Sequence, residues 1–296
     1  MELPNLPAFA DKSFSMALFS KEKLRWIFRR HPLLYYTRYL LLAKNHNSDE
    51  VGHLGSYSDT NGVTDVPPCY FDVNARMEIP AGADEFDKAT AISTYLRRHI
   101  KGGRGLGYAS DKALRLMLDG KGGVCSDFSQ IFNNFCLINN IAVKEWGCID
   151  RFFNARFAHT FNEVYSQRYG KWIAIDVHQG LYFTADDAGV PLSGVEVFRR
   201  ARQGQPNKFR FFVPGYQPSS LSRLENIYGP EAIPFLIVNY RNREIDKYFN
   251  RFRDKFPVFI ISAMLILLRK NFHFLFVLDN YKVKLLPRYF RNLATR

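Results

Sequence analysis

A pair of glycines directly before a helical pattern constrains this chain more than any other feature. Gly122 and Gly123 precede Val124 and Cys125, and apolar residues then recur at helical spacing, namely Phe128, Ile131, Phe132, Phe135 and Ile138. The spacing predicts a helix over residues 125–139 with one buried face. Cys125 therefore lies in the first turn, where unpaired amide hydrogens and a partial positive charge favour the nucleophilic thiolate over the thiol.

Two β-rich segments follow this helix, and each carries one polar group of interest. Residues 159–165 begin with His159 and residues 171–177 contain Asp176, and both segments are rich in β-branched and aromatic side chains. The polar stretch between them contains a glycine, so the sequence predicts a β-hairpin.

The length of the hairpin loop decides how His159 and Asp176 meet. A two-residue loop at Gln167-Arg168 puts them directly opposite each other, and a four-residue loop at 167–170 puts His159 opposite His178 with Asp176 as a diagonal neighbour. Opposed Cβ atoms are ~5 Å apart and diagonal ones ~7–8 Å, so we expect the first register to suit a hydrogen bond and the second to strain it. A three-residue loop would separate the two side chains onto opposite faces.

Taken alone, Cys125 favours a structural interpretation, because a lone Cys is among the most buried residue types. The combination of features favours a different one. Glycines before the Cys, a helix after it, and a His and an Asp that pair on a hairpin are typical of a Cys-His-Asp catalytic triad. The amide hydrogen of Cys125, at the helix start, is the candidate donor to an oxyanion.

At these residues the chain resembles the transglutaminase-like branch of the papain-like thiol enzymes. The resemblance runs from about residue 83 to residue 203 and is best over 122–125, 159–165 and 172–176. It implies that Cys125 attacks a carboxamide or peptide carbonyl, that His159 acts as acid and base, and that Asp176 orients His159.

Two departures from the family pattern stand next to the triad but not in it. Val177-His178 follows the Asp where the family shows a proline and a small polar residue, and Thr160-Phe161 replaces a small residue and an aromatic. Gly-Gly-x-Cys followed by His and Asp is also similar to arylamine N-acetyltransferases. Residues 162–165 and Trp172 favour the transglutaminase-like family.

The expected chemistry is cleavage or transfer of an amide or peptide acyl group through a Cys125 thioester, as in an amidase, a protease or a transamidase. Two alternatives stay open: a non-catalytic interaction module that keeps the fold, and a thiol acyltransferase that uses a thioester donor. Outside the triad, four residues are candidates for contact with the substrate: Trp146, Glu163, Trp172 and His178. No cofactor and no metal site is expected, because the four cysteines lack metal-type spacing.

The chain has 296 residues, 47% of them apolar, which is enough to build a sizeable core. We expect an α+β fold in which the nucleophile helix packs on an antiparallel sheet, as the resemblance implies, with helical extensions at both ends. Four parts are expected: a basic helical extension over 1–47, a loop-rich linker with a short strand near 70–79 over 48–82, a catalytic domain over 83–215, and a basic, apolar and aromatic extension over 216–296.

Charge is concentrated at the two ends of the chain. The net charge is +13, residues 1–47 carry 8 Lys and Arg against 3 Asp and Glu, and residues 238–296 carry 13 against 4. No secretory signal is apparent, so a cytoplasmic location is expected, with membrane association as an alternative. The expected substrate is a protein, a peptide or a small amide, and no nucleic-acid motif is present.

Residues 256–278 combine a thirteen-residue apolar run with nearby basic residues. The run is shorter than the ~20 residues of a spanning helix. Three interpretations remain: a buried helix and strand that complete the domain, an interfacial segment on anionic lipid, or a site for an acidic partner. The buried helix and strand are preferred.

Overall fold

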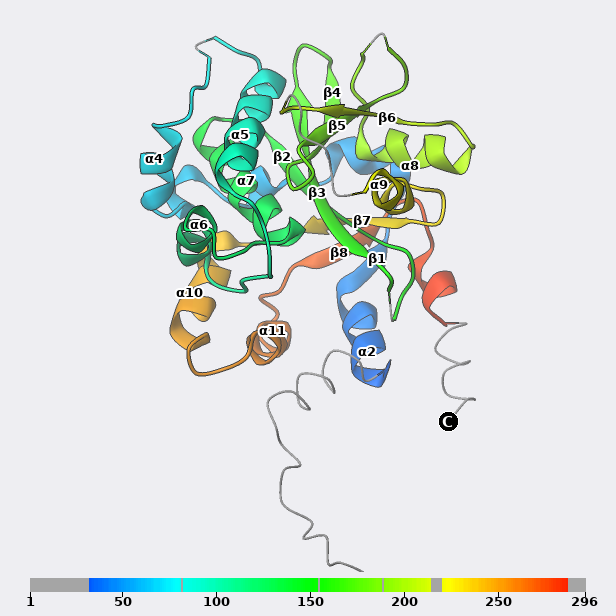
Figure 1. Ribbon diagram of the computed structural model, residues 1–296. Coiled ribbons are helices and arrows are strands. Elements are labelled where there is room, and N and C mark those ends of the chain that lie inside the picture. The colour runs from blue at the N-terminus through cyan, green and yellow to red at the C-terminus, as the bar shows by residue number, and fades with distance from the viewer. Residues whose placement is uncertain (1–31, 81, 154, 188, 214–219, 287–296) are drawn as a thin grey trace, which may run out of the picture.

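The computed structural model describes residues 32–80, 82–153, 155–187, 189–213 and 220–286 (Figure 1). Its strands are β1 (Ala43–Asn45), β2 (Val143–Ile149), β3 (Ala158–Ser166), β4 (Lys171–Asp176), β5 (Leu181–Thr184), β6 (Lys208–Phe211), β7 (Ile233–Val238) and β8 (His273–Phe276). Its helices are α2 (Pro32–Leu42), η2 (Ser48–His53), α3 (Tyr57–Thr60), η3 (Val63–Asp65), α4 (Cys69–Asn74), α5 (Glu85–His99), α6 (Ser110–Leu118), α7 (Cys125–Ile138), α8 (Gly194–Arg202), α9 (Leu221–Ile227), α10 (Asn242–Phe252) and α11 (Val258–Leu267).

The described strands form a single sheet in the order β1-β8-β7-β2-β3-β4-β5-β6. Every neighbouring pair is antiparallel except β1 and β8, which are parallel, so the sheet is mixed at one edge. The α+β prediction is confirmed. The expectation of a helical C-terminal extension is only partly correct. The apolar segment 233–238 forms β7, which pairs with β2 in the middle of the sheet.

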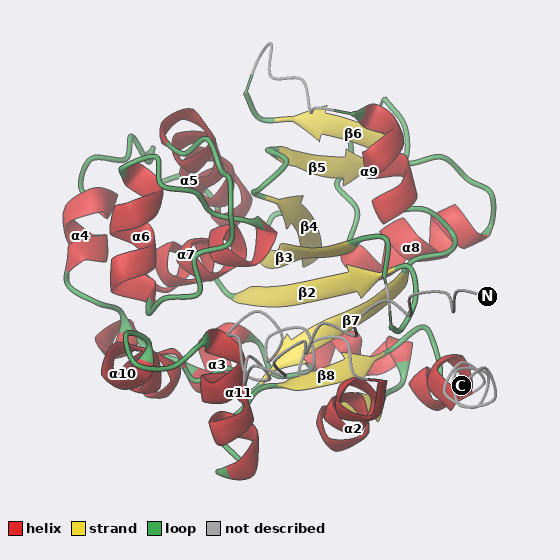
Figure 2. Ribbon diagram, turned by 60° about the horizontal axis from the view of Figure 1, so that its bottom comes forward, coloured by secondary structure: helices red, strands yellow, loops and turns green. Residues whose placement is uncertain are grey.

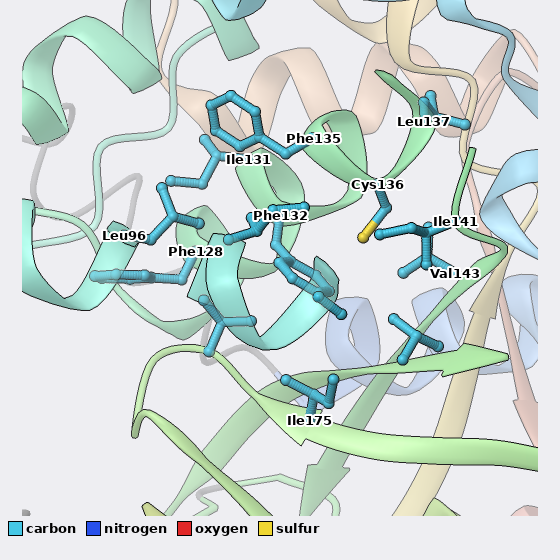
Figure 3. Packing of buried hydrophobic residues seen from close by; sticks show 14 of the residues in the cluster. Leu96, Phe128, Ile131, Phe132, Phe135, Cys136, Leu137, Ile141, Val143 and Ile175 are labelled. Carbon is cyan, nitrogen blue, oxygen red and sulfur yellow. The ribbon is translucent and has the colours of Figure 1, made fainter. Parts of the chain in front are cut away.

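Helices cover both faces of the sheet. Helices α4, α5, α6 and α7 gather on one side, and α8 and α9 on the other (Figure 2). The apolar stripe of α7 packs above Ile175 of β4, and these residues belong to the largest apolar cluster of the described residues (Figure 3). The second cluster lies on the opposite face, where Trp146 and Phe161 of the sheet meet Phe198 of α8 and Leu224 of α9.

The helix expected over residues 125–139 is confirmed as α7. Phe128, Ile131, Phe132 and Phe135 are all fully buried, as the 3.6-residue period requires of one helix face. Burial of these side chains on the sheet is what holds the first turn of α7, and with it Cys125, against β3.

The short strand expected near residues 70–79 is wrong, because the structure has helix α4 there. Tyr70, Val73 and Met77 are the buried residues of this stretch. Their spacing of three and then four residues is that of one helix face, not of alternation along a strand. The linker as a whole consists mainly of short helical turns.

The preferred interpretation of residues 256–278, a buried helix and strand, is correct for the elements α11 and β8, but only Ile261 and Leu265 of α11 are buried. No helix in the described ranges combines the length and the apolar character needed to cross a membrane. The helical pattern expected before Pro32 falls outside the described residues.

We expect Phe132→Ala to lower the free energy of unfolding by about 3–5 kcal/mol, because the ring is fully buried between α7 and the sheet. The matched control is Phe71→Ala, whose ring is 41% exposed, with an expected loss below about 1 kcal/mol. Urea unfolding followed by circular dichroism measures both. Equal losses in the two variants would contradict the placement of α7.

Candidate active site

The two glycines before Cys125 allow two loops to approach each other closely. The amide of Gly123 donates to the carbonyl of Arg104 (2.9 Å), and the amide of Gly103 donates to the carbonyl of Gly123 (2.8 Å). Gly122 has φ +133°, and a Cβ atom there would lie 2.5 Å from the Arg104 carbonyl oxygen. A side chain at position 122 would therefore push the glycine-rich loop 101–107 away from the start of α7.

Asp127 fastens the start of α7 to the same loop. Its carboxylate accepts hydrogen bonds from the amides of Val124 (2.9 Å) and Leu106 (3.2 Å). Neither bond uses the amide of Cys125, which is the first residue of the helix and has no acceptor one turn earlier. That amide remains the candidate oxyanion donor.

The hairpin of β3 and β4 has the longest of the three loops considered, with four residues. Ser166 pairs with Lys171 and Asn162 pairs with Ile175, so residues 167–170 form the loop and Asp176 is diagonal to His159. The expectation that this register strains the pair is wrong, because His159 Nε2 and Asp176 Oδ2 are 2.7 Å apart. An imidazole is long enough to reach a diagonal neighbour, and strand twist brings the two side chains closer than a flat sheet would.

The structure brings all three residues of the expected triad together. Asp176 is fully buried, His159 is 6% exposed, and Cys125 is partly exposed. The Cys125 thiol lies close enough to the His159 side chain for that side chain to lower its pKa. Because Nε2 of His159 faces Asp176, the Nδ1 atom is the one left for the thiol.

These contacts shift the pKa values of the three groups in a consistent way. Burial raises the pKa of Cys125, but the hydrogen bond and charge of His159 and a hydrogen bond with the Thr160 backbone outweigh it, so the net pKa is lowered. Burial lowers the pKa of His159, whereas the charge and hydrogen bond of Asp176 raise it, to about 10. Burial raises the pKa of Asp176, but the charge and hydrogen bond of His159, with smaller contributions from His178 and the amide of Gln179, together outweigh it, so the net pKa is lowered. The site thus favours a thiolate beside an imidazolium.

Tyr228, which sequence reasoning missed, belongs to this site. Its hydroxyl donates to Asp176 Oδ2 (2.7 Å), the same oxygen that faces His159, and its ring meets the His159 ring edge-on. The amide of Gln179 donates to Asp176 Oδ1 (2.9 Å). No local signal marks Tyr228, because it follows α9 and is 52 residues from Asp176 in the sequence.

The further candidates for substrate contact separate into three groups. Trp146 and Glu163 are buried and bonded to each other, with Trp146 Nε1 2.6 Å from Glu163 Oε2, so neither is free to contact a substrate. Trp172 is four residues from Asp176 along β4, which is ~13 Å, and its ring carries the Lys144 ammonium (3.9 Å). The structure therefore does not place Trp146, Glu163 or Trp172 as substrate contacts beside the triad, because each already pairs with another residue of the fold.

His178 is the candidate that does lie at the triad. Its ring is 5.9 Å from the His159 ring, centroid to centroid, and packs edge-on against Phe128. Burial lowers the pKa of His178 to about 4, so its imidazole is neutral near pH 7, where the imidazole of His159 is charged. A neutral His178 adds no second positive charge beside the imidazolium.

A cavity of about 220 Å³ lies next to the first turn of α7, and Cys125, His159 and Asp176 are not themselves part of its lining. Ser126 and Thr160, the chain neighbours of Cys125 and His159, line it, and so does Glu145 of β2. The rest of the lining comes from the C-terminal part of the chain, with Asp246 of α10 and an apolar set made of Ile237, Tyr240, Ile245, Phe249 and Phe272. The cavity is therefore built from two regions that are far apart in the sequence.

Two carboxyl groups give this cavity its polar character. Burial raises the pKa of Glu145 to about 8, and its Oε2 accepts from the side-chain amides of Gln130 (2.6 Å) and Asn133 (2.9 Å). Burial also raises the pKa of Asp246, to about 6, and its carboxylate accepts from the amide and hydroxyl of Ser110. Within the described part of the chain, no Lys, Arg or His side chain lines the cavity.

We expect Asp176→Asn to slow alkylation of Cys125 by iodoacetamide about tenfold or more at pH 6.5, since each unit by which the thiol pKa rises lowers the thiolate fraction tenfold. Removing the carboxylate lowers the pKa of His159 from about 10, so the imidazolium no longer stabilises the thiolate. The rate should recover above pH 9, where a thiol ionises unaided. Peptide mass spectrometry over a pH series measures this.

Buried Cys136 and Cys148, whose pKa values are raised by burial, serve as internal references, and Asp119→Asn on the exposed surface is the control variant. Unchanged Cys125 reactivity in Asp176→Asn would show that the carboxylate does not act on the thiol.

Comparison with known proteins adds one finding. Residues 74–177 match the family model of the transglutaminase-like superfamily, and this match ends directly after Asp176. A search of curated proteins finds no significant match to the chain. Residues 74–177 therefore carry a domain of the transglutaminase-like superfamily, and the match does not extend to the rest of the chain.

Proposed function

We propose that this protein is a Cys-His-Asp thiol enzyme that cleaves or transfers the acyl group of an amide or peptide through a thioester on Cys125. One observation carries the proposal: a partly exposed thiol has its pKa lowered by the neighbouring His159, and His159 bonds the buried Asp176 at 2.7 Å. Cys136 and Cys148 provide the contrast. Both are fully buried, and burial raises the pKa of each.

The first half of the proposed reaction forms the thioester. The Cys125 thiolate attacks the carbonyl carbon, and the negative charge that develops on the carbonyl oxygen is met by the Cys125 amide at the start of α7. When the C–N bond breaks, the His159 imidazolium gives its proton to the leaving amine. Asp176 stays ionised and stabilises the imidazolium before this transfer.

The second half of the reaction releases the acyl group. His159, now neutral, takes a proton from water or from a second amine, which attacks the thioester carbonyl and expels the Cys125 thiolate. Water as acceptor gives hydrolysis, and an amine gives transfer. The same residues serve both outcomes, so the acceptor that reaches the thioester decides between amidase or protease activity and transamidation.

We expect a peptide or amide substrate to leave an acyl group on Cys125, detectable after acid quenching as a mass increase on the peptide that contains this residue. Hydroxylamine should convert the adduct into a hydroxamate and restore the free thiol, as thioester chemistry requires. Cys125→Ala should abolish turnover, and His159→Ala should reduce it by about 10³-fold or more. A library of short peptides and primary amides supplies the substrates.

The rival proposals predict different results in the same experiment. A non-catalytic module would give no adduct on Cys125, although iodoacetamide would still alkylate the thiol. An acyltransferase that uses a thioester donor would give the adduct with a thioester, but not with an amide or a peptide. Either result would replace the proposal of amide cleavage.

We further propose that the cavity next to the first turn of α7 holds the part of the substrate next to the reacting carbonyl and prefers neutral or cationic groups to anionic ones. Glu145 and Asp246 supply carboxyls to the lining of the cavity, and the basic residues of this positively charged chain stay outside it. A bound cation would favour the ionised carboxylates, whereas an anion would face them without a counter-charge. The apolar wall suits a short aliphatic or aromatic stem.

We expect Glu145→Gln together with Asp246→Asn to raise KM for a substrate with a basic side chain about tenfold relative to its neutral isostere, since a lost charge partner of ~1.4 kcal/mol corresponds to that factor. The value of kcat should change little, because neither carboxyl contacts Cys125. Asp119→Asn, which changes an exposed carboxyl, is the control. Equal effects on the basic and the neutral substrate would contradict the assignment of the cavity.

A further inference from the structure

Three helical segments that are distant in the sequence meet at one end of the molecule. They are α2, α11 and residues 281–286, and both views place them at the same end (Figures 1 and 2). One apolar cluster joins them: Tyr36 and Tyr39 of α2 share it with Tyr281 and Leu285, and Ile266 of α11 packs against it. We call residues 35–44, 256–270 and 281–286 the α2–α11 end.

This end carries most of the exposed large apolar side chains. Eleven such side chains occur among the described residues, and the seven that belong to the α2–α11 end are Leu40, Leu41, Phe256, Leu267, Leu268, Val283 and Leu286. Leu267 is 83% exposed and Leu41 is 61% exposed. Scattered single exposed leucines need no explanation, but a concentration at one end marks an interaction surface.

Helix α11 shows why this surface is unusual for a helix in water. A surface helix normally has one apolar and one polar face, but Val258–Leu267 reads VFIISAMLIL and is apolar all round. Ile261 and Leu265, one turn apart, are its buried residues and pack on α10. The other faces of α11 are partly exposed to water, although their side chains are almost all apolar.

Basic residues predominate at the same end, although Lys270 pairs with Glu244 (2.5 Å) and Lys284 lies 3.9 Å from Asp279, two carboxylates outside the three ranges. Its three ranges contain no Asp or Glu, and the basic residues in them are Arg38, Lys44, Arg269, Lys270, Lys282 and Lys284. All of these except Lys270 are exposed. Exposed basic and exposed apolar side chains therefore occur in the same three segments.

We propose that the α2–α11 end binds the surface of an anionic membrane, with its exposed leucines among the acyl chains and its basic residues at the lipid headgroups. Ten helical residues span only ~15 Å, which suits a helix that lies in the interface and is too short to cross a bilayer. A second copy of the chain would bring like charges face to face, and an acidic protein alone would leave the helix's apolar faces unexplained. Anionic lipid satisfies both the charge and the apolar surface.

The test is sedimentation of the full chain with vesicles of phosphatidylcholine containing about 30 mol % phosphatidylserine, compared with pure phosphatidylcholine. We expect binding to the anionic vesicles at least tenfold tighter than to the neutral ones, falling as salt rises from about 0.05 M to 0.5 M because surface charge is screened. Leu267→Glu should weaken binding at least tenfold. Leu221→Glu, at a leucine that is 56% exposed on α9, is the matched control and should change binding less than twofold.

A second variant tests the charges separately. Lys282→Glu with Lys284→Glu should abolish the preference for anionic vesicles while circular dichroism and the alkylation rate of Cys125 stay unchanged, which keeps folding apart from binding. Equal recovery of the wild type in the supernatant with and without vesicles would overturn the proposal. A second result would also overturn it: the wild type does not bind vesicles but forms a dimer in light scattering, and Leu267→Glu dissociates that dimer. The surface would then bind a second copy of the chain.

Discussion

A fully buried carboxylate, Asp176, is the constraint on which the site depends. A buried ion is stable only when several donors surround it, and three parts of the chain supply them: His159 from β3, the amide of Gln179 from the turn after β4, and the hydroxyl of Tyr228 after α9. Satisfying this one group fixes the orientation of the imidazole and ties the C-terminal part of the chain to the hairpin. The lowered pKa of Cys125 follows from that arrangement.

The C-terminal part of the chain completes the domain in two further ways. Strand β7 pairs with β2 and extends the sheet beyond the region that matches the superfamily model, and α10 supplies part of the lining of the cavity next to the first turn of α7. The residues that surround the reacting groups therefore come from both parts. If the proposed membrane contact forms, it also involves α11, which packs on α10 through Ile261 and Leu265.

Local patterns predicted what local physics controls. The stripe of Phe128, Ile131, Phe132 and Phe135 predicted α7, since a helix repeats every 3.6 residues whatever surrounds it. The hairpin and the shared face of His159 and Asp176 were also predictable, because side chains alternate strictly along a strand. The length of the hairpin loop was not predictable, so the strand register stayed open. The imidazole of His159 also reaches its diagonal neighbour Asp176 more easily than the sequence suggested. Near residue 70, helical spacing was missed and a strand was expected in place of α4.

By itself, the sequence determined the helix that carries Cys125, the hairpin, and the order of Cys, His and Asp, since these depend on periodicity and on residue type, and the family resemblance implied the α+β fold. Only the tertiary structure decided which polar groups share an environment. It joined Tyr228 to Asp176 across 52 residues, buried Trp146 and Glu163 against each other, and placed Asp246 and Glu145 in the lining of one cavity. The physical reason is that pairing strands and packing helices bring distant residues together through contacts that leave no periodic trace in the chain.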